Sequence, residues 1–75
     1  MSDQAELFAA VGKALYGKQW KGEMARNRNV RDKTVDEWAM GVGPAIPVGV
    51  WDELRAELDA LRKHIVDDLL PQIPR

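Results

Sequence analysis

The chain has 75 residues, of which 11 are basic and 12 acidic, with one histidine and no cysteine. Such a length allows one small domain whose core supplies only ~3–5 kcal/mol of net stability, so pairing of two copies is a reasonable expectation. The lack of cysteine excludes disulfides and thiolate metal sites. The N-terminal residues lack the basic region of a secretory signal, and no apolar run approaches the ~20 residues of a membrane span. We therefore expect a soluble, cytoplasmic protein.

The charge of the chain is small overall but unevenly distributed. The net charge of −1 gives no support to nucleic-acid binding. Residues 11–35, however, carry seven basic and two acidic side chains, a net charge of +5, whereas residues 51–75 carry four basic and six acidic side chains, a net charge of −2. This distribution suits a protein that presents one basic face to phosphates, and an ordinary solvated surface is the alternative.

Apolar side chains recur at helical spacing, which predicts an all-α fold, a compact bundle of about four helices. The first three helices are expected over about 3–16, 20–27 and 32–40, with Gly17 as a left-handed stop after the first. Between the second and third, Asn29 can adopt the left-handed conformation of a sharp turn and Val30 fills the corner. The inner face of the third helix is expected to hold Val35, Trp38, Ala39 and Val42.

A loop rich in glycine and proline, residues 41–47, precedes a longer C-terminal helix. Pro47 is expected as its first residue, and Pro71 ends it after about Leu70, so the helix spans 47–70. A heptad seam runs along it through Trp51, Leu54, Leu58, Leu61 and Ile65. Two interpretations stay open: the seam covers the core of its own chain, favoured for Trp51 and Leu54, or it pairs with a second copy. The second interpretation is favoured for Leu58, Leu61, Ile65 and Leu69.

Residues 14–51 resemble the small helix-turn-helix proteins of bacteria and their phages, the broad repressor/Cro-like group. The resemblance lies in ALYG at 14–17, Trp20, Met24-Ala25, Val30, Val35, Trp38 and IPVGVW at 46–51. It implies a single helix-turn-helix domain over 1–75, with the motif at 20–40, that acts as a cytoplasmic transcription regulator and homodimer. In such proteins the second helix of the motif lies in the major groove of double-stranded DNA.

Carried over to this sequence, the resemblance implies a set of DNA-binding residues. Base edges would be contacted by Arg31, Asp32, Lys33, Asp36 and Glu37, and phosphates by Lys21 and Arg26, with a hydrogen bond from Thr34. Arg28 is grouped with these contacts, although it occupies a position that is usually apolar. Arg31 is the best candidate for a bidentate contact with guanine.

Other classes of function find little support in the sequence. The single serine, threonine and histidine lie far apart, adjacent acids diverge on a helix, and no glycine-rich phosphate loop follows a strand. We therefore expect no enzyme, no cofactor, no metal site and no small-molecule substrate. The three tryptophans are expected in the core rather than as stacking platforms for bases. His64 is expected at an exposed helical position, paired with Asp68.

The sequence thus predicts sequence-specific binding of duplex DNA by a homodimer, as a repressor in a phage or mobile element. The alternative is a protein that has kept this fold but no longer binds DNA in a sequence-specific manner. Such a protein would be an interaction module, for example an anti-CRISPR-like phage inhibitor that grips a host nucleic-acid-binding protein. The acids Asp36 and Glu37 and the acidic C-terminal helix favour this alternative.

Overall fold

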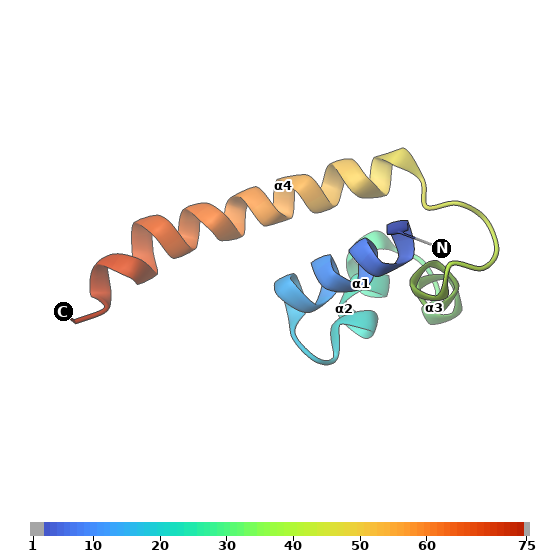
Figure 1. Cartoon of the computed structure of the whole chain (residues 1–75), viewed down its shortest axis with the longest axis horizontal. Coiled ribbons are helices and arrows are strands. Elements are labelled where there is room, and N and C mark those ends of the chain that lie inside the picture. The colour runs from blue at the N-terminus through green and yellow to red at the C-terminus, as the bar shows by residue number, and fades with distance from the viewer. Residues whose placement is uncertain (1–2, 75) are drawn as a thin grey trace.

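A computed structural model describes residues 3–74, and this part of the chain is helical with no strand. Its helices are α1 (Asp3–Tyr16), α2 (Trp20–Arg28), α3 (Asp32–Met40) and α4 (Val48–His64), followed by a π-helical turn (Ile65–Leu69) and a 3₁₀ turn (Leu70–Gln72). Helices α1 to α3 gather into one body, while α4 crosses this body and projects beyond it, giving dimensions of 47 × 24 × 21 Å (Figure 1). The predicted all-α fold with a long C-terminal helix is confirmed.

The core is organised around Phe8, whose side chain is fully buried. Its ring meets Trp20 of α2, Trp38 of α3 and Trp51 of α4 edge to face, with centroids 5.5, 5.6 and 6.2 Å away. One residue of α1 therefore contacts all three other helices. Edge-to-face pairs of this kind contribute about 0.5–1.5 kcal/mol each beyond the burial of their area. The core position predicted for Trp20 and Trp38 is confirmed, and Trp51 is partly buried.

The turn between α2 and α3 is fixed by its backbone. Asn29 has φ 57° and ψ 46°, so the predicted left-handed conformation is confirmed. The N–H of Val30 donates to the carbonyl of Ala25 (3.0 Å), and the N–H of Asn29 donates to that of Arg26 (3.2 Å). These two bonds form a Schellman motif, which satisfies the last carbonyls of α2 and sets the direction in which α3 leaves. Val30 packs partly buried against the core, as expected.

Three sequence-based expectations need correction. Val42 does not face inward, since its side chain is 51% exposed: the chain reverses at the left-handed Gly41 (φ 74°), and the buried Ile46 fills the core instead. Pro47 stands just before α4 rather than inside it. The end of the last helix is not regular, because the N–H of Leu70 bonds to the carbonyl of Ile65 across a wider π turn. This wider turn accommodates Pro71, which has no N–H and whose ring crowds a preceding carbonyl in an α-helix.

Candidate nucleic-acid interface

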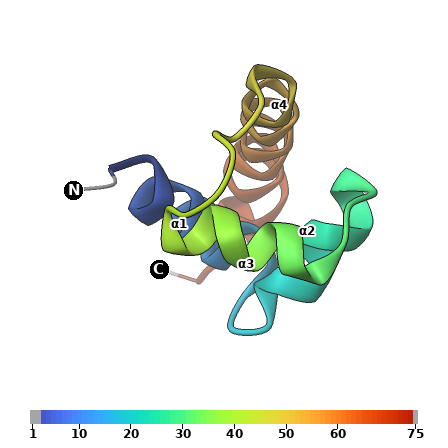
Figure 2. The same ribbon diagram turned by 90° about the vertical axis from the view of Figure 1, so that its right-hand side faces the viewer.

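Helices α2 and α3 form a bihelical unit joined by residues 29–31. The unit is held on the body by its inner side chains, and Met24, Ala25, Val35 and Trp38 are all buried. In Figure 2, α3 lies toward the viewer with no other helix in front of it, and the loop 41–47 leaves from its C-terminal end. Its outer face is thus left open, as a helix that enters a groove of DNA requires.

The structure places most of the sequence-derived candidates on or beside this open face. Arg31 stands directly before α3 and is exposed, as are Asp32 and Lys33 in its first turn. Thr34, Asp36 and Glu37 are partly buried on the same helix. The exposed Lys21 and Arg26 lie on α2. Within residues 3–74, Arg31 and Lys33 form no ion pair, so their charges are available to a ligand.

Two of the candidate phosphate contacts carry acidic partners. The Nζ of Lys21 on α2 lies 3.0 Å from Oδ1 of Asp36 on α3, and both side chains are about half exposed. Arg26 forms an ion pair with Glu23 one turn earlier on α2. Exposed ion pairs are typically worth only about 0–1 kcal/mol, so a phosphate can replace either carboxylate at little cost. The Lys21–Asp36 pair also offsets the negative charge that Asp36 brings to α3.

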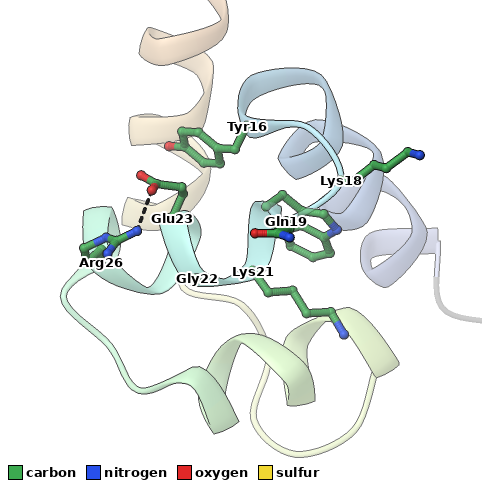
Figure 3. Close-up of a pocket in the computed structure, with 8 residues that line it drawn as sticks. Tyr16, Lys18, Gln19, Lys21, Gly22, Glu23 and Arg26 are labelled. Carbon is green, nitrogen blue, oxygen red and sulfur yellow. Dashed lines mark hydrogen bonds and ion pairs between the residues drawn. The ribbon is translucent and has the colours of Figure 1, made fainter.

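A shallow, open cleft lies at the start of α2, the first helix of the bihelical unit (Figure 3). It is lined by Tyr16, Lys18, Gln19, Trp20, Lys21, Gly22, Glu23 and Arg26. Figure 3 shows Lys18 and Lys21 reaching outward on one side and the Glu23–Arg26 pair on the other. The first N–H groups of a helix have no partner within the helix, and Gln19 provides no side-chain cap. Lys18 is not among the sequence-derived candidates, although it belongs to the basic stretch 11–35 that signals this region.

Arg28 does not lie with the other candidates. Its side chain is only 3% exposed, and its Nε lies 3.0 Å from Oε1 of Glu53 on α4. It also forms an ion pair with Glu57, which accepts a hydrogen bond from the hydroxyl of Tyr16 on α1. The expectation that Arg28 contacts DNA is therefore wrong, because its guanidinium is buried between helices. The sequence held a signal, since Trp20, Met24 and Arg28 share one face of α2.

This cluster of Tyr16, Arg28, Glu53 and Glu57 ties α1, α2 and α4 together. Burial, and secondly the hydrogen bond to Glu57, raises the pKa of Tyr16 above its usual 10.0. The Nη1 of Arg28 is buried without a hydrogen-bond partner within residues 3–74. A charge held in this way stabilises the fold only while its partners stay in place, because an unpaired buried charge is costly. The cluster therefore fixes α4 relative to the bihelical unit.

The residues predicted for pairing of two copies fall into two groups. Leu58 packs partly buried against the core of its own chain, and Leu61 is partly buried. Ile65 and Leu69 lie beyond the body and are exposed. Near them, Nδ1 of His64 lies 2.8 Å from Oδ2 of Asp68, which confirms the pair expected from their spacing.

Two other kinds of feature, a metal-ligand cluster and a membrane-spanning helix, are absent from residues 3–74. No group of three or more histidine, aspartate or glutamate side chains in residues 3–74 is placed to hold a metal ion. Over the same range, no helix has the length and apolar content to cross a bilayer. Comparison of the chain with protein-family models, curated proteins and solved structures gives no match.

Proposed function

We propose that this protein binds double-stranded DNA through α3 and acts as a small transcription regulator, with repression in a phage or mobile element as its role. The observation that carries the proposal is the bihelical unit α2–α3. Its Schellman turn at Asn29 fixes the angle between the helices, and its outer face is uncovered. An exposed second helix at a fixed angle is what insertion into a major groove needs.

In this proposal affinity comes from the cations around α2. The cleft at the start of α2 is lined by three cations, Lys18, Lys21 and Arg26. Backbone N–H groups in the first turn of a helix have no partner within the helix and also favour an anion. Each phosphate that they neutralise releases counterions, so binding weakens as salt rises. Lys21 and Arg26 exchange their exposed carboxylate partners for phosphates on binding.

Specificity comes from the start of α3. The first residues of a reading helix contact base edges, and here these are Arg31, Asp32 and Lys33. Arg31 is exposed and unpaired within the described chain, so its guanidinium is free for the two acceptors of a guanine. One such contact discriminates against a wrong base by ~1–3 kcal/mol. Glu37 on the same helix is an acceptor suited to the amino group of cytosine.

One observation favours a second candidate function, in which the protein is an interaction module that binds another protein. The pairs Lys21–Asp36 and Arg26–Glu23 neutralise two of the basic side chains near α3 within the chain itself. The surface that would face DNA is therefore less basic than the count of lysines and arginines suggests. A protein partner that is itself nucleic-acid-binding and basic would meet Glu37 and Asp32 instead.

A titration of a labelled random-duplex library, followed by fluorescence anisotropy at about 50 and 200 mM salt, separates the two candidates. We expect binding by the natural chain that weakens steeply between the two salt concentrations. The variant Arg31→Ala/Lys33→Ala should lose at least tenfold in affinity. The variant Arg62→Ala/Lys63→Ala, which removes the same charge from α4, should bind like the natural chain.

Absence of binding at the lower salt concentration overturns the proposal and leaves the interaction module as the better explanation. Equal losses in the two double variants would overturn the assignment to α3, because they would show that only net charge matters.

A further inference from the structure

The segment that follows α4, residues 65–73, exposes a run of apolar side chains. Leu58 is the last residue of α4 that packs against the core. Beyond it Ile65, Val66, Leu69, Leu70 and Ile73 are between 38% and 62% exposed. Figure 1 shows this segment extending away from the body, with no other element beside it. Soluble monomers rarely leave a contiguous apolar patch of this size in water.

A groove lined mostly by apolar side chains lies at the other end of the same helix, between α1 and α4. Its walls are Leu7 and Val11 of α1 and Trp51, Leu54 and Leu58 of α4, with Gln4 and Arg55 at the rim. Leu7 is 53% exposed in this groove, although the adjacent Phe8 is fully buried. The apolar groove therefore lies near the start of α4, and the exposed apolar segment follows the end of α4. We call this segment, residues 65–73, the tail.

We propose that the groove of one copy receives the C-terminal segment of a second copy, so that the two α4 helices pair antiparallel. In an antiparallel pair, opposite positions have numbers with a constant sum. For a sum near 127, Leu58 lies opposite Leu69 of the other copy. Ile73, which is extended after the π and 3₁₀ turns, then lies in the region of Leu54. Each exposed tail then covers a groove, and the same contacts occur twice around a twofold axis. A parallel pair would set tail against tail and leave both grooves empty.

The amount of surface and the charges agree with a second copy as the occupant. Pairing covers Leu7 in the groove and five apolar side chains beyond α4, which are between 38% and 62% exposed, and it covers them in both copies. A specific interface buries about 1,000 Å² or more in total. Arg55 at the rim of the groove and Asp67 on the tail form no ion pair within residues 3–74. In the antiparallel register Gln72 of the other copy lies opposite Arg55, and Asp67 stands five positions from it, about one and a half helical turns. Opposite charges therefore lie at the same end of the pair.

Sedimentation equilibrium of the full chain tests whether the tail makes the pair. We expect the natural protein to be a dimer at about 100 µM. Leu69→Glu/Ile73→Glu should raise the dissociation constant at least tenfold. The control Met40→Glu/Val48→Glu, which alters apolar side chains 65% and 75% exposed outside the groove and tail, should remain dimeric. Circular dichroism confirms that each variant is folded. A monomeric natural protein at this concentration, or equal dissociation of both variants, overturns the proposal.

Cross-linking tests the direction of the pair, because the chain has no cysteine of its own. Arg55→Cys and Gln72→Cys place single thiols at exposed positions whose numbers sum to 127. With a short bis-maleimide, a mixture of the two variants should form the mixed cross-link several-fold faster than either variant cross-links to itself. Faster self-cross-linking of Arg55→Cys would show a parallel pair and overturn the register. Neither experiment contains DNA, so its failure is distinct from failure of the proposed function.

Discussion

The indole ring of Trp20 rests directly on the backbone of Gly12. A Cβ built on residue 12 would lie 2.1 Å from Cε3 of Trp20, closer than any side chain allows. Helices α1 and α2 therefore approach each other at a distance that only glycine permits, which brings the Trp20 ring to Phe8 at the centre of the core. Glycine costs about 1 kcal/mol inside a helix, and the close packing of Trp20 offsets this cost.

Replacing Gly12 with alanine should destabilise the fold by about 2–4 kcal/mol, although alanine is the better helix former. The ring of Trp20 cannot keep its place, so its contact with Phe8 is disturbed. Urea unfolding gives the free energy. Gly22→Ala is the matched control, because a Cβ added at residue 22 would meet nothing within 4 Å, and it should stabilise by about 0.5–1 kcal/mol. Similar effects of the two substitutions would contradict this account of Gly12.

The turn at Asn29 should tolerate glycine but not a residue that avoids positive φ. We expect Asn29→Gly to leave the free energy of unfolding within a few tenths of a kcal/mol or to raise it. Asn29→Ala should lower it by about 1 kcal/mol, since L residues strain at φ 57°. Thermal unfolding of the three proteins checks this order. If alanine proved as stable as glycine, the left-handed turn would not control the end of α2.

Arg28 should matter for stability rather than for DNA. Arg28→Ala leaves Glu57 facing an empty site and removes the link from α2 to α4, so we expect a loss of about 3 kcal/mol in urea unfolding. Arg26→Ala removes an exposed ion pair on the same helix and should change the free energy by less than about 0.5 kcal/mol. Under conditions where Arg28→Ala is folded, its DNA affinity and salt dependence should match those of the natural chain. A selective loss of DNA affinity would place Arg28 at the interface after all.

The Tyr16–Glu57 hydrogen bond predicts a pH dependence at alkaline pH. The pKa of Tyr16 is raised in the folded protein, so the folded state holds the phenol proton more tightly than the unfolded chain. This contribution to stability is complete below the usual pKa of 10.0 and is lost as pH rises through the raised value.

The stability difference between the natural chain and Tyr16→Phe should therefore stay constant below about pH 10 and shrink as the pH rises above it. Urea unfolding of both proteins on both sides of this pH measures the difference, in which the titration of lysines cancels. A difference that stays constant with pH would contradict the raised pKa.

Local patterns are sufficient to predict the helices and the turn. The spacing of apolar residues locates the first three helices and the start of the fourth to within one residue, because each buries one face against a common centre. The regular part of the fourth helix ends at His64, six residues before the predicted end. Asn29 is recognisable since few residue types accept a left-handed turn. Ile65 and Leu69 are recognisable as apolar positions beyond the core, and they are exposed.

The features that escape prediction depend on contacts between distant segments. Arg28 looks like a surface cation because its partners Glu53 and Glu57 stand 25 and 29 positions later, on a helix whose placement no local pattern gives. The Lys21–Asp36 pair likewise depends on how α2 and α3 cross. The groove beside Leu7 exists only once α4 has been laid along α1. In physical terms, helix formation is local, whereas the matching of charges and grooves follows from packing.

The arrangement of all three indoles around a single phenyl ring has a spectroscopic consequence. Intrinsic fluorescence reports on the part of the molecule near Phe8. It does not report on the helical arm beyond Leu58, residues 59–74, which contains no tryptophan, tyrosine or phenylalanine. Far-ultraviolet ellipticity, by contrast, senses every helical residue, the arm included. An arm that frays before the rest melts will make the two signals diverge along a denaturation curve, and coincident curves will mean that it melts together with the indole cluster.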